Sequence, residues 1–173
     1  LMIAAQALRL KGVKRIGILD CDEHYGNGTD SIIEKLDLKK SVKHWTLGNQ
    51  NISAENAESF LAALPGIIQK EFQGCKILLF QAGADPWIFD ALGGRLTKDQ
   101  LRRMHKIVFE TCKKMEIPVC WNLAGGYATP FQHVLDIHNN TAIECISVYE
   151  EKNVGSLREK ICTVDSFEAA PKK

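Results

Sequence analysis

The sequence predicts an α/β domain built on a mostly parallel sheet that is flanked by helices. Three observations support this fold class. Short apolar runs alternate with segments of helical periodicity, which is the pattern of consecutive strand–helix units. The apolar runs are nearly continuous, as expected for strands that are covered on both faces. A chain of 173 residues is long enough to bury one substantial core.

The expected strands are short and rich in apolar residues. They cover residues 15–19, 42–47, 76–81, 118–123 and 142–149. The last of them precedes a polar C-terminal segment and is expected to complete the sheet.

The expected helices lie between these strands. They cover residues 2–10, 31–36, 53–73 and 97–115, and a fifth helix begins near residue 129. Ser53 is expected to cap the third helix, and the pair Pro65 and Gly66 to break or kink it. Thr97 and Gln100 have the spacing of a capping box at the start of the fourth helix.

Two further patterns support the fourth and fifth helices. The fourth has a single apolar stripe, formed by Leu101, Met104, Val108, Cys112 and Met115. At the fifth, residues 129–132 read TPFQ, which places Pro at the first helical position and Gln at the third.

Composition and charge exclude several classes of function. The net charge is +1 and the basic residues are scattered, which argues against nucleic acid as the main ligand. No apolar run reaches the length of a membrane span, and no secretory signal is visible. The six cysteines form no CxxC pair, so we expect free thiols rather than a zinc finger. This usage predicts a cytoplasmic protein, with nuclear access if the source is eukaryotic.

Residues 20–29, DCDEHYGNGT, directly follow the first predicted strand. Alternate side chains of an extended chain share a face, so Asp20, Asp22 and His24 are expected on one side. Carboxylates and imidazoles are ligands that zinc accepts. The segment therefore suggests a metal site, although a polar turn at residues 27–28 explains the same sequence.

Two more strand ends carry polar or glycine-rich sequence, namely residues 81–86, QAGADP, and residues 123–128, LAGGYA. Ligands of open parallel sheets bind beyond the carboxyl ends of the strands. Asp22, His24 and Asp85 are therefore candidates for a three-ligand metal site with open positions, which is the catalytic arrangement. Tyr127 is a candidate donor to a developing oxyanion. Each piece alone has a plainer explanation, since Asp85 begins a common Asp-Pro turn and Tyr127 is also suited to packing.

Together these segments resemble the motifs of the histone deacetylase and acetylpolyamine amidohydrolase family. The matching runs are ILDCDEHYGNGT at 18–29, QAGAD at 81–85 with DALGG at 90–94, and LAGGY at 123–127. Their order and approximate spacing also fit, and the resemblance covers most of residues 2–146. It implies the three-layer arginase/deacetylase fold, truncated at its N-terminus, and a metal-dependent amide hydrolase.

The resemblance also implies a role for each candidate residue. Asp22, His24 and Asp85 match the metal ligands, with zinc as the metal or iron(II) in its place. Tyr127 matches the tyrosine that polarises the acetyl carbonyl. Two further residues, Asp20 and less closely Thr46, match a structural site for a monovalent cation such as potassium. The implied substrate is acetyl-lysine in a protein or an acetylated polyamine.

One part of the family's machinery has no counterpart in this sequence. The family's paired active-site histidines lie upstream of the Asp-x-His motif, where this chain has almost nothing. The other histidines, at positions 44, 105, 133 and 138, are expected to be structural or on the surface. Since the chain opens at Leu1 in the middle of a predicted helix, we expect it to be part of a longer protein.

Residues 1–150 are therefore interpreted as the C-terminal part of a deacetylase-like catalytic domain, followed by a polar tail at 151–173. The alternative is a catalytically incomplete binding or interaction module. Either way, lost neighbouring strands would leave apolar faces open, so we expect the isolated chain to aggregate or dimerise.

Overall fold

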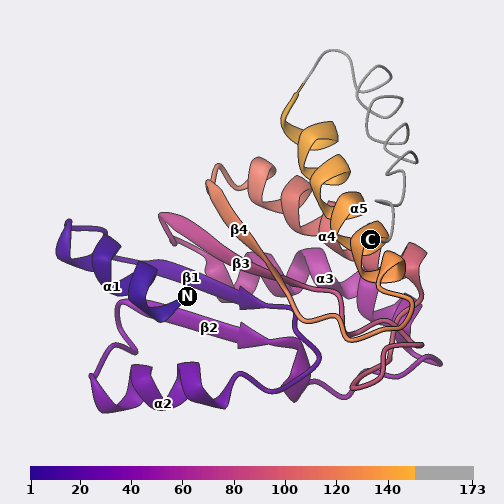
Figure 1. Cartoon of the computed structure of the whole chain (residues 1–173). Helices are drawn as coiled ribbons and strands as arrows, with labels where there is room; N and C mark the ends of the chain where they lie inside the picture. Colours follow the sequence, from indigo (N-terminus) through magenta and orange to yellow (C-terminus); the bar gives the residue numbers. More distant parts are fainter. Residues whose placement is uncertain (151–173) are drawn as a thin grey trace, which may run out of the picture.

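The sheet has four strands in the order β2–β1–β3–β4, and every neighbouring pair is parallel. This is seen in the computed structural model, which describes residues 1–150 (Figure 1). The strands are β1 (Ile16–Asp20), β2 (Val42–Thr46), β3 (Ile77–Gly83) and β4 (Val119–Ala124). The predicted α/β class with a parallel sheet is confirmed. The predicted polar tail, residues 151–173, lies outside the described residues.

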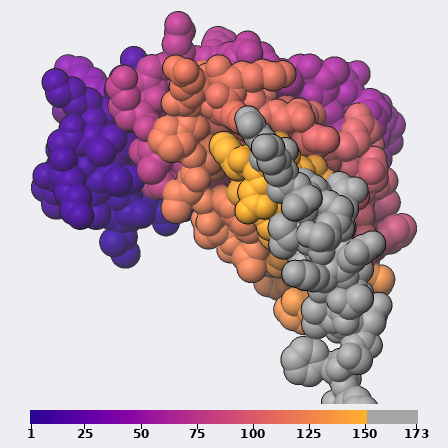
Figure 2. Space-filling view, turned by 90° about the horizontal axis from the view of Figure 1, so that it is seen from above, coloured from indigo at the N-terminus to yellow at the C-terminus, as the bar shows by residue number. Residues whose placement is uncertain are grey.

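Helices cover both faces of the sheet and make three layers. On one face lie α1 (Met2–Leu10) and α2 (Asn27–Lys35). On the other lie α3 (Ala57–Phe72), α4 (Lys98–Lys114) and α5 (Gln132–Tyr149). A short 3-10 helix, Leu47–Asn49, follows β2. The indigo N-terminal residues gather at one end of the molecule, apart from the yellow C-terminal part of α5 (Figure 2).

The two faces of the sheet carry separate apolar cores. Alternation along β1 sends Leu19 to the core under α3 and α4, and Ile16 and Ile18 to the core under α1 and α2. In the larger core, Gly17 leaves room for α3, because a Cβ there would lie 2.7 Å from Phe72 Cδ1. Burial of β1 on both faces fixes its register and therefore where the loop after it leaves the sheet.

Four helix-to-strand turns stand at the amino ends of the strands. Each contains one residue with positive φ: Gly12 (+92°), Asp37 (+49°), Gly74 (+77°) and Glu116 (+56°). After α1, α2 and α4 an apolar residue then donates its N–H to the carbonyl five residues back, as in the Schellman motif. These bonds are Val13 to Leu8 at 3.1 Å, Leu38 to Ile33 at 2.8 Å and Ile117 to Cys112 at 3.0 Å.

Three helices begin elsewhere than predicted, the first two being α2 and α3. The turn expected at residues 27–28 is the first turn of α2, because Thr29 and Asp30 both donate their N–H groups to the Gly26 carbonyl. Ser53 does not cap α3. Its N–H donates instead to Asn56 Oδ1 at 2.8 Å, which closes a separate turn before the helix starts at residue 57.

The start of α5 also differs, since the helix begins at Gln132 rather than at residue 129. A turn comes first, in which the carbonyl of Pro130 accepts from the N–H of His133 at 3.2 Å. By contrast, the capping box of α4 is confirmed. Thr97 Oγ1 accepts from the N–H of Gln100, and the Gln100 side chain accepts from the N–H of Thr97.

The break predicted at Pro65 is wrong, because α3 runs through this residue, and the alternative of a kink stays a prediction. The helix buries a stripe that includes Leu61, Leu64 and Ile68 against the sheet. Burial of each such side chain is worth about 1.5–3 kcal/mol, so the stripe outweighs the roughly 3 kcal/mol that an internal proline costs.

The last predicted strand is also wrong, since residues 142–149 belong to α5. Buried side chains recur at helical spacing along this segment, at Val134, Ile137, Thr141 and Glu144. Glu144 accepts from Arg102 Nε at 2.6 Å, which ties α5 to α4. The helical period of this buried face decides the structure over the β-branched composition of the segment.

Burial of the strands on both faces holds for β1 but not for β4. Within residues 1–150, β4 pairs only with β3 and stands at the edge of the sheet. Its Cys120 and Leu123 are exposed. Self-association through this edge stays a prediction, which sedimentation of the chain at several concentrations would test.

The cysteines of the described residues are all free thiols, as predicted, and Cys162 lies outside that part of the chain. None of the helices within residues 1–150 combines the length and the apolar character that a membrane span requires.

Candidate metal centre

The candidate ligands are carried by the two central strands of the sheet. Asp22 and His24 follow β1, and Asp85 follows β3, two residues after its last residue. The two strands are paired in parallel, with Asp20 opposite Gln81, so the loops that follow them leave the sheet at the same end of the strands. Neighbouring strands lie about 4.8 Å apart, which brings side chains just beyond their ends within reach of one another.

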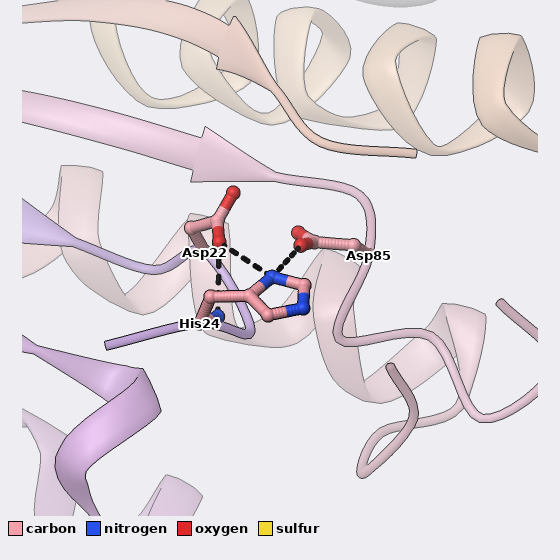
Figure 3. Close-up of side chains that lie close together, drawn as sticks. All are labelled: Asp22, His24 and Asp85. Carbon is pink, nitrogen blue, oxygen red and sulfur yellow. Dashed lines mark hydrogen bonds and ion pairs between the residues drawn. The ribbon is translucent and has the colours of Figure 1, made fainter. Parts of the chain in front are cut away.

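The three side chains meet at the ring of His24 (Figure 3). His24 Nδ1 lies 3.2 Å from Asp22 Oδ1 and 3.1 Å from Asp85 Oδ2. Asp22 Oδ1 also accepts from the backbone N–H of His24 at 2.9 Å, which fixes the turn after β1. One ligand atom from each residue lies within 4.8 Å of the other two.

The cluster contains a buried carboxylate that, within residues 1–150, lacks a partner for one of its oxygens. Asp85 is fully buried, and within the described residues its Oδ1 has no hydrogen-bond partner. Burial, followed by the charge of Asp22, raises the pKa of Asp85 above its ordinary value. Burial lowers the pKa of His24, but hydrogen bonds and charges of the two aspartates outweigh it and leave that pKa raised. The carboxylates contribute to both shifts, since two of them in a confined space favour an added positive charge.

A divalent cation fits these residues. Four tetrahedral ligands about 2.0–2.1 Å from zinc stand roughly 3.3 Å apart, and the His24 ring nitrogen lies 3.1–3.2 Å from both carboxylates. Two oxygens and one nitrogen are also a donor set that zinc accepts. The side chain of His24 is 56% exposed, so the cluster is open to solvent on one side and leaves room for a fourth ligand.

Two glycines make the close approach around Asp85 sterically feasible. A Cβ at Gly83 would lie 2.8 Å from the Asp22 Cα and 2.9 Å from Asp85 Oδ1. A Cβ at Gly125 would lie only 2.3 Å from Asp85 Oδ1, and the φ of +58° at Gly125 is in the left-handed region. The turn after β4 therefore lies directly against the buried carboxylate.

Tyr127 stands in that turn, two residues after Gly125. Its side chain is 52% exposed, and its backbone N–H donates to Asp90 Oδ2 at 2.7 Å. The predicted convergence of three strand ends is thus seen in the main chain, because the turns after β1, β3 and β4 all approach Asp85. The catalytic role of Tyr127 stays a prediction.

Asp20 does not belong to the cluster, contrary to the expectation that it shares a side with Asp22 and His24. Asp20 is the last residue of β1 and stays within the sheet, and its Oδ1 accepts from Gln81 Nε2 at 3.0 Å. The backbone N–H of Asp22 donates to the same oxygen at 3.1 Å. Thr46 lies opposite Asp20 in the register of β1 and β2, as the predicted cation site requires.

A histidine also lies near the second carboxylate oxygen of Asp20. His44 Nε2 is 3.9 Å from Asp20 Oδ2, and His44 Nδ1 is 2.8 Å from Asp30 Oδ1. Burial lowers the pKa of His44, but the nearby carboxylates of Asp20 and Asp30 outweigh it and raise that pKa. A potassium ion at Asp20 and Thr46 therefore stays a prediction, and a charged His44 is an alternative counter-ion.

Other residues of the site were missed by the sequence prediction. Asp90 holds the backbone of Tyr127, and Arg95 donates from Nε to Glu23, between the two ligands of the first loop. Asp90 was part of a recognised run, but nothing in the sequence pairs it with a residue 37 positions later. The contact depends on the tertiary path of two loops.

Comparison with known proteins finds a similar fold but no significant match by sequence. No family model matches the sequence, and the comparison with curated proteins gave no significant match. Solved structures do match. One is an HDAC homologue complexed with SAHA, with a TM-score of 0.61 and 21% identity over 93% of this chain and 49% of that one.

Two further structures agree with it. An HDAC homologue from Aquifex aeolicus matches with a TM-score of 0.61 and 17% identity, covering 94% of this chain and 50% of its own. The HDA15 HD domain matches with a TM-score of 0.65 and 18% identity, covering 93% of this chain and 52% of its own. The chain thus spans about half the length of each structure that it matches. The four-stranded parallel sheet with its two helical layers has the fold of half of a histone deacetylase homologue.

Proposed function

We propose that this chain carries the metal-binding part of a zinc-dependent deacetylase that hydrolyses the amide of acetyl-lysine or of an acetylated polyamine. The observation that carries the proposal is the cluster of Asp22, His24 and Asp85 at one edge of a deacetylase-like sheet. One of the matched homologues is complexed with SAHA, which supports a substrate-like ligand for this chain as well.

Each residue of the cluster has a distinct task. Asp85 supplies a buried negative charge, and Asp22 fixes the turn that presents His24. Bound at this cluster, zinc supplies Lewis acidity, which polarises an amide carbonyl and lowers the pKa of water. The hydroxyl of Tyr127 donates a hydrogen bond to the oxyanion that develops when the carbonyl carbon becomes tetrahedral.

Proton transfer is the step for which residues 1–150 offer no evident group. Amide hydrolysis needs a base for the attacking water and an acid for the leaving amine. His105 is fully buried, His44 is tied to Asp30, and His133 lies 3.0 Å from Lys98 Nζ. The resemblance to the deacetylase family implies histidines upstream of the Asp-x-His motif, and we propose that these carry out proton transfer in the parent protein.

Zinc binding tests the proposal directly. We expect about one zinc per chain in isothermal titration, and at least a tenfold loss of affinity in Asp22→Asn, which removes a ligand charge with little change of shape. Asp37→Asn is the matched control, because Asp37 lies in a turn at the opposite end of the strands, where Asn tolerates its positive φ. Equal affinity of Asp22→Asn and the native chain would refute the ligand assignment.

The second candidate function is a non-catalytic interaction module that retains the fold. The absence of an assigned base in residues 1–150 favours it. It predicts zinc binding without turnover in the parent protein, whereas the deacetylase predicts release of acetate from an acetyl-lysine peptide or an acetylpolyamine. The reading frame upstream of Leu1 also separates the two, because a His-His pair followed by a glycine-rich loop would restore the catalytic set. The cytoplasmic location stays a prediction under both.

A further inference from the structure

The loop between β3 and α4, residues 84–97, carries a second buried carboxylate besides that of Asp85. Asp90 is 8% exposed. Its Oδ1 accepts from the backbone N–H of Leu92 at 3.0 Å, within its own turn. Its Oδ2 accepts from the backbone N–H of Tyr127 at 2.7 Å, across to the turn after β4. Both oxygens are therefore engaged by main-chain donors, and only the second bond joins two loops.

The turn that Asp90 holds, residues 125–127, is also packed against Asp85 and against α5. Gly125 and Gly126 have φ values of +58° and +102°, which are conformations that glycine adopts readily. A Cβ at Gly125 would meet Asp85, and a Cβ at Gly126 would lie 2.5 Å from Val134 Cγ1 on α5. Asp90 thus binds the first N–H after the two glycines and fixes the direction in which the chain leaves the turn.

The side chain of Tyr127 depends on this main-chain contact because half of its own surface is exposed. An oxyanion donor acts only when it lies about 2.7–3.1 Å from the position that the charge will occupy. A displacement of about 1 Å in a positioned group is enough to lower a rate strongly. An ordered backbone at residue 127 is therefore the condition for an ordered hydroxyl.

We propose that Asp90 is the positioning residue for Tyr127 and that it sets the tyrosine relative to the metal cluster. The same loop places Asp85 in the cluster and, five residues later, binds the backbone of Tyr127. The loop therefore sets the position of the oxyanion donor relative to the metal ligand. The catalytic part of this inference rests on the proposed function, but the structural part does not.

Hydrogen exchange of the Tyr127 amide, followed by NMR on the whole chain with and without added zinc, tests the structural part. In Asp90→Ala this amide loses its acceptor, and we expect its exchange to become at least tenfold faster. Asp90→Asn keeps one acceptor oxygen in the same place and is expected to restore part of the protection. Asp99→Ala, which removes an exposed carboxylate near the start of α4, is the control and should leave this amide unchanged.

Unchanged protection of the Tyr127 amide in Asp90→Ala would overturn the inference. If that variant loses the whole fold, faster exchange across β1 and β3 will reveal it. Asp90→Asn then decides, because it keeps the shape of the side chain and removes its charge: faster exchange of the Tyr127 amide while β1 and β3 stay protected would support the inference, and native exchange of that amide would overturn it.

The catalytic part is tested in the zinc-loaded parent protein. We expect Asp90→Ala to lower kcat at least tenfold with KM and zinc affinity nearly unchanged. Its effect should be lost in a Tyr127→Phe background, because the two act through one hydroxyl. If no variant turns over any acetylated amine, the proposed function fails, while the exchange experiment still decides the contact between Asp90 and Tyr127.

Discussion

Arg95 donates from Nε to Glu23 Oε1, and this ion pair joins the two loops that carry the candidate metal ligands. Glu23 stands between Asp22 and His24, and Arg95 lies near the end of the loop that carries Asp85. The side chains of Arg95 and Glu23 are only 20% and 12% exposed, and Arg95 Nη1 also donates to the carbonyl of Gln50 at 2.7 Å. One guanidinium therefore ties three loops together.

Arg95→Met should destabilise the chain by about 2 kcal/mol, because it leaves a largely buried carboxylate without its cation. Urea unfolding measures the loss, and zinc titration should show weaker binding as the two loops separate. The double variant Arg95→Met/Glu23→Gln should recover about 1 kcal/mol, since it removes the stranded charge. Additive effects of the two substitutions would show that the pair has no coupling.

Gly125→Ala is expected to weaken zinc binding at least tenfold. The new Cβ would fall 2.3 Å from Asp85 Oδ1 at a positive φ, so either the carboxylate or the turn must move. Gly66→Ala provides the comparison, because that glycine lies in α3 with nothing within 4 Å of an added Cβ. It should raise stability by about 0.5–1 kcal/mol and leave zinc affinity unchanged. Native zinc affinity in Gly125→Ala would contradict the close packing of the turn on Asp85.

Tyr127→Phe should lower the rate of deacetylation by the parent protein about 10²–10³-fold, as loss of one oxyanion donor does in other hydrolases. Zinc affinity should stay within about twofold of the native value, because the tyrosine is not among the clustered ligands. Steady-state kinetics with an acetyl-lysine peptide, together with zinc titration, measures both. Full activity in this variant would remove Tyr127 from the mechanism.

His105 should make the fold sensitive to acid. Its Nδ1 donates to Thr141 Oγ1 at 2.8 Å, since that hydroxyl itself donates to the Ile137 carbonyl. Burial, and then neighbouring His138, lowers the pKa of His105 from its usual value of 6.5 to about 3. Between pH 6.5 and about 3, His105 is protonated in the unfolded chain but not in the folded chain. The free energy of unfolding therefore falls as the pH drops through this range.

The loss attributable to His105 should approach 1.4 kcal/mol for each pH unit in this window. Urea unfolding at pH 7.5 and pH 5.5 measures it, with His105→Gln as the matched variant. Gln keeps a donor for Thr141 but cannot be protonated, so the difference between the two pH values should shrink by about 1.4 kcal/mol. Equal pH dependence in both proteins would exclude His105 as the cause.

The sequence predicted the parallel sheet and the three clustered side chains for the same reason. Apolar strands and the polar residues directly after them are local patterns, and parallel topology then brings the carboxyl ends of neighbouring strands together. The strand predicted at residues 142–149 was wrong because packing against α4 makes this segment helical, and local composition does not report that packing. The strand was predicted to end one residue before Asp20, whereas β1 includes Asp20, and only the positions beyond it are free to turn towards Asp85.

The contacts between loops were beyond a sequence prediction. The partners of Arg95 and Asp90 lie 72 and 37 residues away, and no spacing rule connects them. Arg95 follows the Gly-Gly pair of a recognised run, which marks the loop but not its neighbours. Such pairs become visible only when the loop paths are known.

The four tight turns at the amino ends of the strands have a consequence for re-engineering this protein. Each reverses the chain with a left-handed residue, and three close with a Schellman bond, in which the backbone N–H of an apolar residue donates to the carbonyl five residues back. The chemistry-bearing segments, residues 21–26, 84–97 and 125–131, all lie at the other ends of the same strands. The turns that specify the sheet and the segments that form the candidate site therefore lie at opposite ends of the strands. A combinatorial library could diversify the three segments while the turns, left untouched, continue to specify the sheet.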